Sequence, residues 1–113
     1  MPDPNRRQRA VSYIIKSRTD RKKFFPSALF SEPAWDMLLS LYAAGIEQRA
    51  VSISALAKTA NVEPSTAARW ANALENESLV TRKSVRGEEV ISLSQKGWFA
   101  MDSYFENMSS GMI

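Results

Sequence analysis

Residues 52–80 read SISALAKTANVEPSTAARWANALENESLV, and their pattern predicts two short helices joined by a tight turn. The first helix is expected over residues 53–60, where apolar side chains recur at i, i+3, i+4 and i+7. Ser52 is a suitable N-cap, and Asn61 tolerates the left-handed backbone that ends a helix. Pro64 then opens the second helix at a position where a missing N–H does no harm.

The second helix, predicted over about residues 64–77, has two faces of different character. Its buried face is expected to consist of Ala67, Trp70, Ala71 and Leu74. The opposite face carries short polar side chains and one arginine, namely Ser65, Thr66, Arg69 and Asn72. Side chains of this kind can reach base edges and phosphates without steric or charge conflict, as in a helix-turn-helix whose second helix reads DNA. An ordinary helical hairpin with a solvated polar face is the alternative.

A β-hairpin is predicted after these two helices, over residues 79–93. Thr, Val and Ile are enriched on both sides of a glycine-containing turn at 84–88, and Ile91 and Leu93 are expected to face the core. Three basic side chains are expected to cluster near the tip: Arg82, Lys83 and Arg86. In this position the hairpin is typical of the wing of a winged helix, here residues 82–90, which contacts phosphates or the minor groove. A solvated hairpin, partly neutralised by its two glutamates, is the alternative.

A further helix is predicted before this unit, over residues 33–44, with Ser31 as N-cap and Gly45 as its C-terminal stop. Its core face is expected to consist of Trp35, Leu38, Leu39 and Tyr42, with Met37 and Leu41 flanking them. At most a very short strand is expected at residues 50–51. An aromatic stripe at helical spacing is typical of a core rather than of a ligand site.

The last predicted helix, residues 95–108, opens with Ser94 as N-cap, and Gly97 would allow a neighbouring backbone to approach closely. Its apolar stripe consists of Trp98, Met101, Phe105 and Met108, with Phe99 and Tyr104 beside it. This is more apolar surface than the terminal helix of one small domain needs, and the excess favours a dimer seam. Residues 109–113 are expected to be a loose tail.

The beginning of the chain is expected to be a basic helix or arm, residues 1–23, ahead of a DNA-binding domain at 24–108. Within it a helix is predicted from about residue 5 to residue 17, followed by a solvated connection at 20–23. The apolar segment 24–30 is expected to pack on the body as a short helical turn. The arm's apolar stripe, which covers either this domain's core or that of a second copy, consists of Val11, Ile14 and Ile15.

Charge is distributed unevenly along the 113 residues, whose net charge is +3. The first 25 residues carry eight basic and two acidic side chains, a net +6, and the remaining 88 residues therefore sum to −3. A basic segment on a nearly neutral body suits a phosphate-contacting arm. It suits a solvated helix that keeps the protein soluble equally well.

Composition excludes several classes of function. With no histidine and no cysteine, the common nucleophile–base pairs and the usual zinc and iron ligand sets cannot be built. Paired carboxylates and a glycine-rich phosphate loop are also missing from the pattern, so we expect no enzyme, no cofactor and no metal. The chain has no apolar run of about 20 residues and no signal-peptide core, which favours a cytoplasmic protein of one domain.

The predicted order of helix, short strand, helix-turn-helix, two-stranded wing and helix resembles the winged helix-turn-helix of the multiple-antibiotic-resistance-regulator (MarR) family. The resemblance covers roughly residues 24–105 and is carried by five segments. They are PAWDMLL at 33–39, ISALA at 53–57, STAARW at 65–70, Leu79-Val80, and LSQKG at 93–97. The fold it implies is mainly α with a small β-hairpin wing.

The resemblance implies specific DNA contacts, position by position. It places four side chains of the second helix in the major groove: Ser65, Thr66, Arg69 and Asn72. Ser54 would meet a phosphate, and Arg86 would enter or flank the minor groove. Four features depart from the family's pattern. Ser78 stands where the family usually has glycine, and Glu63 stands where a better N-cap such as Ser or Asp is common. The wing lacks the family's usual Asp-Arg pair, and the C-terminal region is short.

These observations together predict a regulator of transcription that binds duplex DNA in a sequence-specific manner. Its partners would be double-stranded DNA and a second copy of the chain, joined through the N-terminal helix and the 95–108 helix. A protein-interaction module built on the same fold, with no role on DNA, is the alternative. In that case the apolar surface of the last helix would dock a different protein.

Overall fold

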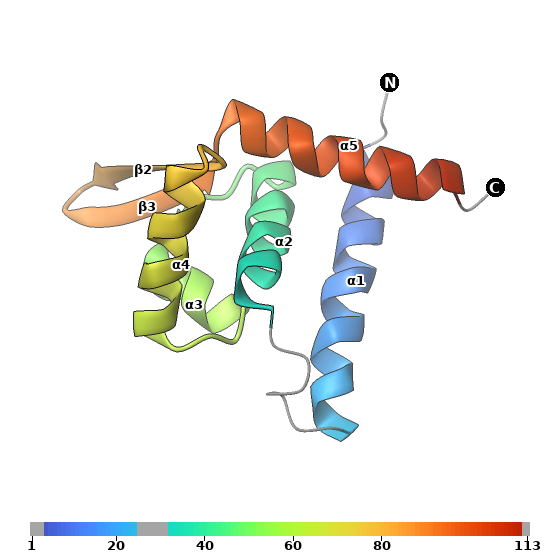
Figure 1. The fold of residues 1–113 in the computed structure, drawn as a ribbon, viewed down its shortest axis with the longest axis horizontal. Helices are drawn as coiled ribbons and strands as arrows, with labels where there is room; N and C mark the ends of the chain where they lie inside the picture. Colours follow the sequence, from blue (N-terminus) through green and yellow to red (C-terminus); the bar gives the residue numbers. More distant parts are fainter. Residues whose placement is uncertain (1–3, 25–31, 112–113) are drawn as a thin grey trace.

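The computed structural model describes residues 4–24 and 32–111. Within these ranges, the chain folds into five helices and one small three-stranded sheet (Figure 1). The elements are α1 (Pro4–Phe24), α2 (Pro33–Ile46), β1 (Val51–Ser52), α3 (Ile53–Thr59), α4 (Pro64–Asn76), β2 (Val80–Val85), β3 (Glu88–Leu93) and α5 (Gln95–Gly111). This order confirms the predicted winged helix-turn-helix, mainly α with a β-hairpin wing.

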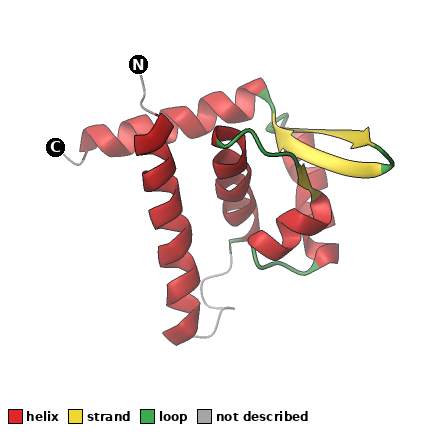
Figure 2. Ribbon diagram, turned by 180° about the vertical axis from the view of Figure 1, so that it is seen from behind, coloured by secondary structure: helices red, strands yellow, loops and turns green. Residues whose placement is uncertain are grey.

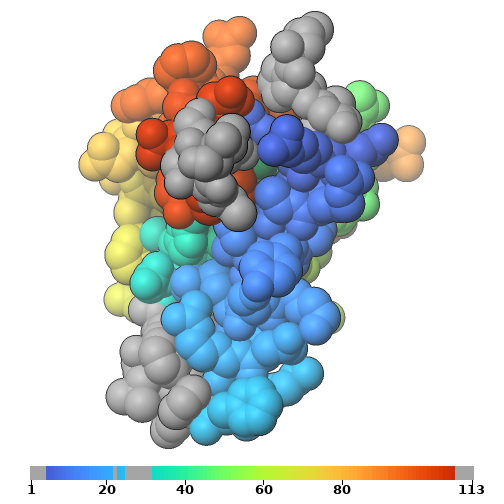
Figure 3. Space-filling model, turned by 90° about the vertical axis from the view of Figure 1, so that its right-hand side faces the viewer, coloured from blue at the N-terminus to red at the C-terminus, as the bar shows by residue number. Residues whose placement is uncertain are grey.

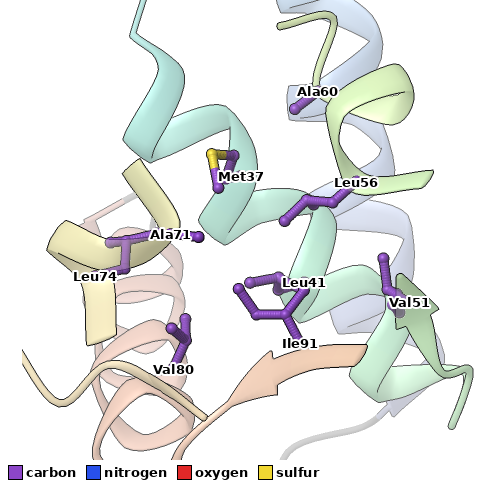
Figure 4. Close-up of a cluster of buried hydrophobic side chains, with 10 residues drawn as sticks. Met37, Leu41, Val51, Leu56, Ala60, Ala71, Leu74, Val80 and Ile91 are labelled. Atoms are coloured by element: carbon purple, nitrogen blue, oxygen red, sulfur yellow. The ribbon is translucent and has the colours of Figure 1, made fainter. Parts of the chain in front are cut away.

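Helix α2 lies at the centre of the molecule and packs on two sides. One side meets α3, α4 and the sheet, where Met37 and Leu41 are buried among side chains that point toward one another (Figure 4). The other side meets α1 and α5, where Leu39 and Tyr42 are buried. The prediction that Met37 and Leu41 only flank the core was therefore wrong, because a helix with neighbours on both sides buries most of its circumference.

Helix α1 is longer than predicted and belongs to the domain's own core. It continues through residues 20–23, which were expected to be a connection, and ends at Phe24. Val11 is fully buried against α2 and α5, with Ile14 and Ile15 partly buried beside it. The apolar stripe of the N-terminal segment thus covers this domain's core. The short helical turn predicted at 24–30 lies, apart from Phe24, outside the described residues.

Three helices end in the same hydrogen-bonded cap, and in each a residue other than glycine takes the left-handed backbone. These residues are Gln48 after α2, Asn61 after α3 and Ser78 after α4, with φ of 58°, 57° and 63°. In each case the N–H of this residue and the N–H of the residue after it donate to carbonyls in the last turn of the preceding helix, which is the Schellman arrangement. The prediction for Asn61 is confirmed, whereas Gly45 lies inside α2 and does not stop it.

Glycine is required at two positions by close packing. A Cβ on Gly45 would lie 2.5 Å from the Trp98 ring, and a Cβ on Gly97 would lie 2.0 Å from the Leu79 carbonyl oxygen. The second distance confirms that Gly97 allows a neighbouring backbone to approach. The helix α5 that contains Gly97 is capped by Ser94 as predicted, since Ser94 Oγ accepts from the Gly97 N–H at 2.9 Å.

The remaining differences concern the ends of elements. Glu32, and not Ser31, is the residue at the N-cap of α2, and its side chain makes no capping hydrogen bond; Ser31 itself lies outside the described residues. Helix α5 continues to Gly111, through most of the segment predicted to be a loose tail. Figure 3 shows the end of α5 lying beside α1 on one face of the molecule.

The sheet is antiparallel in the order β1-β3-β2. Ile91 of β3 is buried against the helices, and Leu93 packs partly against them, as predicted. The turn is tighter than expected, because Arg86 and Gly87 alone connect the strands, with φ of 53° and 79°. Two successive positive φ values match the right-handed twist of a hairpin. The β2–β3 hairpin extends beyond the helices as a wing (Figure 2).

Candidate DNA-binding surface

Local signals in the sequence define the start of α3 and the turn that leads from α3 into α4. Ser52 Oγ accepts from the Ala55 N–H at 3.1 Å and caps α3, as predicted. After the turn, Pro64 stands in the first turn of α4. Ala67, Ala71 and Leu74 are then buried, and the small size of the two alanines lets α4 lie close to α2. The packing of α4 against α2 decides which side chains of α4 face solvent.

The polar face of α4 points outward as the sequence indicated. Ser65, Arg69 and Asn72 are exposed, and Thr66 at the edge of this face is partly buried. Arg69 makes no side-chain hydrogen bond or ion pair with any residue in the described ranges. Ser54, in the first turn of α3, is also exposed, with its Oγ 3.2 Å from that of Ser52. A cationic group surrounded by short hydroxyl and amide side chains is chemically suited to phosphate and base contacts.

Trp70 differs from its prediction, because it stays 37% exposed instead of joining the core. A residue three positions after Ala67 and four before Leu74 lies at the edge of the buried face, about 60° from its centre at 100° per residue. Its ring therefore borders the polar face of α4. The three-residue spacing between Ala67 and Trp70 predicted a buried Trp70. The angle of Trp70 around the helix, relative to the centre of the buried stripe, indicates a position at its edge.

The three basic residues of the wing do not cluster at its tip. Arg86 occupies the turn itself and is exposed. Lys83, three residues away, is exposed on one face of β2. Arg82 is on the opposite face, where its side chain is only 17% exposed. The alternation of a strand separates neighbouring residues in this way, so the predicted cluster was wrong.

Arg82 contacts both the helix α4 and the opposite strand. Its Nε donates to Glu89 Oε1 at 2.6 Å, across the hairpin. Its Nη1 donates to Asn72 Oδ1 at 2.5 Å and to Glu75 Oε1 at 3.4 Å, both on α4. Arg82 thus ties the wing to the helix that carries the polar face. The sequence contained a signal for this role, since Arg82 lies two positions after the buried Val80 and so on the inner face.

The basic residues of α1 are used in part for internal contacts. Arg7 is buried, and its guanidinium pairs with Glu106 and donates to the Asp102 carbonyl at 3.0 Å. Arg18 pairs with Asp36 at 2.5 Å, and both side chains are mostly buried. In Figure 1, α1 lies at one end of the molecule, whereas α4 and the wing lie at the other, with α2 between them. Within one chain, the basic helix and the polar face of α4 are therefore not brought together.

Two further features of the described residues bear on the class of protein. No group of three or more acidic side chains in residues 4–24 and 32–111 is arranged to hold a metal ion. None of the helices described there is long and apolar enough to cross a membrane.

Comparison with known proteins gives one family match. Residues 30–85, which include α2, the helix-turn-helix and β2, match the model of the MarR family. This range contains most of the segments on which the resemblance in the sequence rested. No curated protein matches the chain.

Solved structures share the fold. AF1382 from Archaeoglobus fulgidus is 22% identical, with a TM-score of 0.62 over 81% of this chain and 96% of that one. A proposed DNA-binding protein from Ralstonia eutropha is 29% identical, with a TM-score of 0.58 over 66% of this chain and 98% of that one. MepR, a transcription regulator of a multidrug efflux pump in Staphylococcus aureus, is 21% identical, with a TM-score of 0.59 over 92% of this chain and 77% of that one.

The family match and the fold of the solved structures therefore agree with the winged helix-turn-helix described above. MarR family proteins are transcription regulators rather than enzymes, which agrees with a chain that has no histidine and no cysteine. This chain is a winged helix-turn-helix transcriptional regulator of the MarR type.

Proposed function

We propose that the chain binds duplex DNA in a sequence-specific manner, with α4 in the major groove and the wing on the backbone or minor groove. The observation that carries this proposal is that Arg69 is exposed and makes no hydrogen bond or ion pair within the described residues. Its side chain is exposed in the middle of the polar face of α4, and no partner among the described residues neutralises it. Arginine donates in a bidentate manner to guanine and pairs with phosphates.

The wing supplies the second group of contacts. Arg86, in the turn, and Lys83, on the outer face of β2, are exposed. A single arginine at the end of a hairpin is sufficient to enter a narrow minor groove. Ser54, at the start of α3, would meet a phosphate near the helix N-terminus. Arg82 holds the angle between the wing and α4, which fixes the spacing between the two groups of contacts.

A second copy of the chain would complete the DNA-binding unit. MarR family regulators typically act as dimers, and here the most exposed aromatic side chains of the described residues lie on the two terminal helices. Tyr13 of α1 is 73% exposed and Phe99 of α5 is 74% exposed. We therefore infer a homodimer through α1 and α5, with two α4 helices about 34 Å apart on successive major grooves.

The test is a titration of a labelled generic duplex across salt concentrations, followed by selection of a preferred sequence. Micromolar affinity that falls steeply with salt is expected from phosphate contacts. Arg69→Ala should weaken binding to the selected sequence by roughly 1–3 kcal/mol. Arg9→Ala is the matched control, because it removes the same charge from an exposed position of α1.

Three results would contradict the proposal. Equal losses in Arg69→Ala and Arg9→Ala would mean that only the overall charge attracts DNA. Unchanged affinity in Arg69→Ala would remove this residue from the contact surface. No binding even at low salt would favour the alternative, a winged helix that docks a protein through its terminal aromatic residues.

A further inference from the structure

We propose that Arg82 determines the base preference of Asn72 by holding the carbonyl oxygen of its side-chain amide. Arg82 would then be a specificity-determining residue that acts through another side chain. The inference rests on the proposed function, because it requires that Asn72 faces a base in the major groove.

The contact is built from residues of both DNA-binding elements. Arg82 Nη1 lies 2.5 Å from Asn72 Oδ1, and the same guanidinium is held by Glu89 at 2.6 Å and approached by Glu75 at 3.4 Å. With 17% of its side chain exposed, Arg82 is largely enclosed between α4 and the hairpin. Its position is fixed by two carboxylates, so the amide of Asn72 meets a donor that is already oriented.

The orientation of the Asn72 amide follows from the chemistry of its partner. Arginine has only N–H donors and no acceptor. The atom of Asn72 that faces Arg82 must therefore be the oxygen, and the NH₂ group must point away. Asn72 is exposed, so these two N–H donors are directed to the surface of α4.

This orientation changes what Asn72 can recognise. An asparagine prefers adenine when its NH₂ donates to N7 while its oxygen accepts from the adenine N6 amino group. Here the oxygen is bound by a cationic guanidinium, which fixes the amide plane and weakens the oxygen as an acceptor for a second donor. Only the NH₂ group remains fully available. It can donate to N7 of either purine, or to O6 of guanine, so adenine loses its advantage over guanine.

The experiment is selection of bound sequences from a random duplex library by the full-length protein. The position read by residue 72 is identified as the one whose preference disappears in Asn72→Ala. At this position the wild-type chain should accept adenine and guanine within about threefold of each other. Arg82→Met keeps most of the side chain's length but has no donor, so it frees the oxygen and should favour adenine over guanine by about tenfold.

Arg9→Met is the matched control, because it removes the same charge from an exposed position of α1, at the opposite end of the molecule from α4 and the wing. It should leave the preference at this position unchanged. A second measurement uses no DNA: the NMR signals of the Asn72 side-chain NH₂ should shift in Arg82→Met and not in Arg9→Met.

The outcomes separate the inference from the proposed function. A wild-type chain that strictly selects adenine at this position overturns the inference, whether or not Arg82→Met folds. So does an Arg82→Met variant that loses affinity equally for all sequences and keeps the wild-type preference at this position, because Arg82 would then act only by holding the wing or by contacting a phosphate. If the wild-type chain binds no duplex, the proposed function fails. The NMR comparison would then show whether the Arg82–Asn72 contact is formed in the free protein.

Discussion

The Tyr42 hydroxyl donates a hydrogen bond to Asp102 Oδ1 at 2.5 Å, which joins the central helix α2 to the last helix α5. Arg7 of α1 approaches the same hydroxyl at 3.4 Å, so three helices meet at one polar contact inside an otherwise apolar cluster. The aromatic ring of Tyr42 also stacks on Phe105 at 5.2 Å. Removal of this contact should therefore loosen α5 from the body.

The first prediction concerns the pH dependence of stability. Burial, and then the neighbouring Asp102 carboxylate, raise the pKa of Tyr42 to about 12 from its ordinary value of 10. In the unfolded chain the hydroxyl loses its proton at the ordinary value, so the free energy of unfolding should fall between about pH 10 and pH 12. Tyr42→Phe should be less stable than wild type by about 1 kcal/mol at pH 8, and its stability should fall less above pH 10.

Urea unfolding at pH 8 and at pH 11 measures both effects. Tyr13→Phe is the control, because Tyr13 is 73% exposed. Parallel pH curves for wild type and Tyr42→Phe would show that the hydroxyl is not linked to folding.

The second prediction compares the two glycines that packing requires. In Gly97→Ala the new methyl group would lie 2.0 Å from the backbone oxygen of Leu79, which cannot move without displacing the start of the wing. In Gly45→Ala it would lie 2.5 Å from the Trp98 ring, a side chain that can turn. We expect Gly97→Ala to cost about 3 kcal/mol and Gly45→Ala about 1 kcal/mol. Thermal unfolding of the two variants would refute this if their order were reversed.

The third prediction concerns Ser78, which takes the left-handed backbone after α4 with φ of 63°. Glycine adopts this conformation without strain. Ser78→Gly should therefore raise the free energy of unfolding by about 0.5–1 kcal/mol, even though glycine gains entropy in the unfolded chain. Asn61→Gly is the comparison, with φ of 57°, and should gain less because asparagine tolerates this backbone. Chemical denaturation that shows a loss in Ser78→Gly would contradict the argument.

The helix-turn-helix was predictable because its signals are local. Ser52, Asn61 and Pro64 each act on the backbone within one turn of their own position. Their effect does not depend on tertiary contacts, so it could be predicted from the sequence. The ends of the outer elements were less predictable. Helix α1 continues past residue 17, and α2 ends beyond Gly45, because Gly45 makes room for the Trp98 ring inside the helix and the cap falls at Gln48.

The candidate site was predictable in outline and not in its internal contacts. Periodicity placed Ser65, Arg69 and Asn72 on one face of α4, and the structure shows them exposed. It could not show that Arg82 binds Asn72, because a contact between residues ten positions apart depends on the angle of the wing. For the same reason, net charge over the first 25 residues overstated the free positive charge, since Arg7 is buried with acidic partners from α5.

The last prediction tests the proposed homodimer. Tyr13 and Phe99 lie on the outward faces of α1 and α5, where a second copy would cover them. The double variant Tyr13→Ser with Phe99→Ser should leave the core intact but shift the sedimentation of the protein from dimer to monomer, because loss of apolar area weakens association. Its affinity for a two-site operator should fall far more than its affinity for a half-site. Val85→Ser, on the exposed wing, is the control that should remain dimeric. A double variant that still sediments as a dimer would place the interface elsewhere.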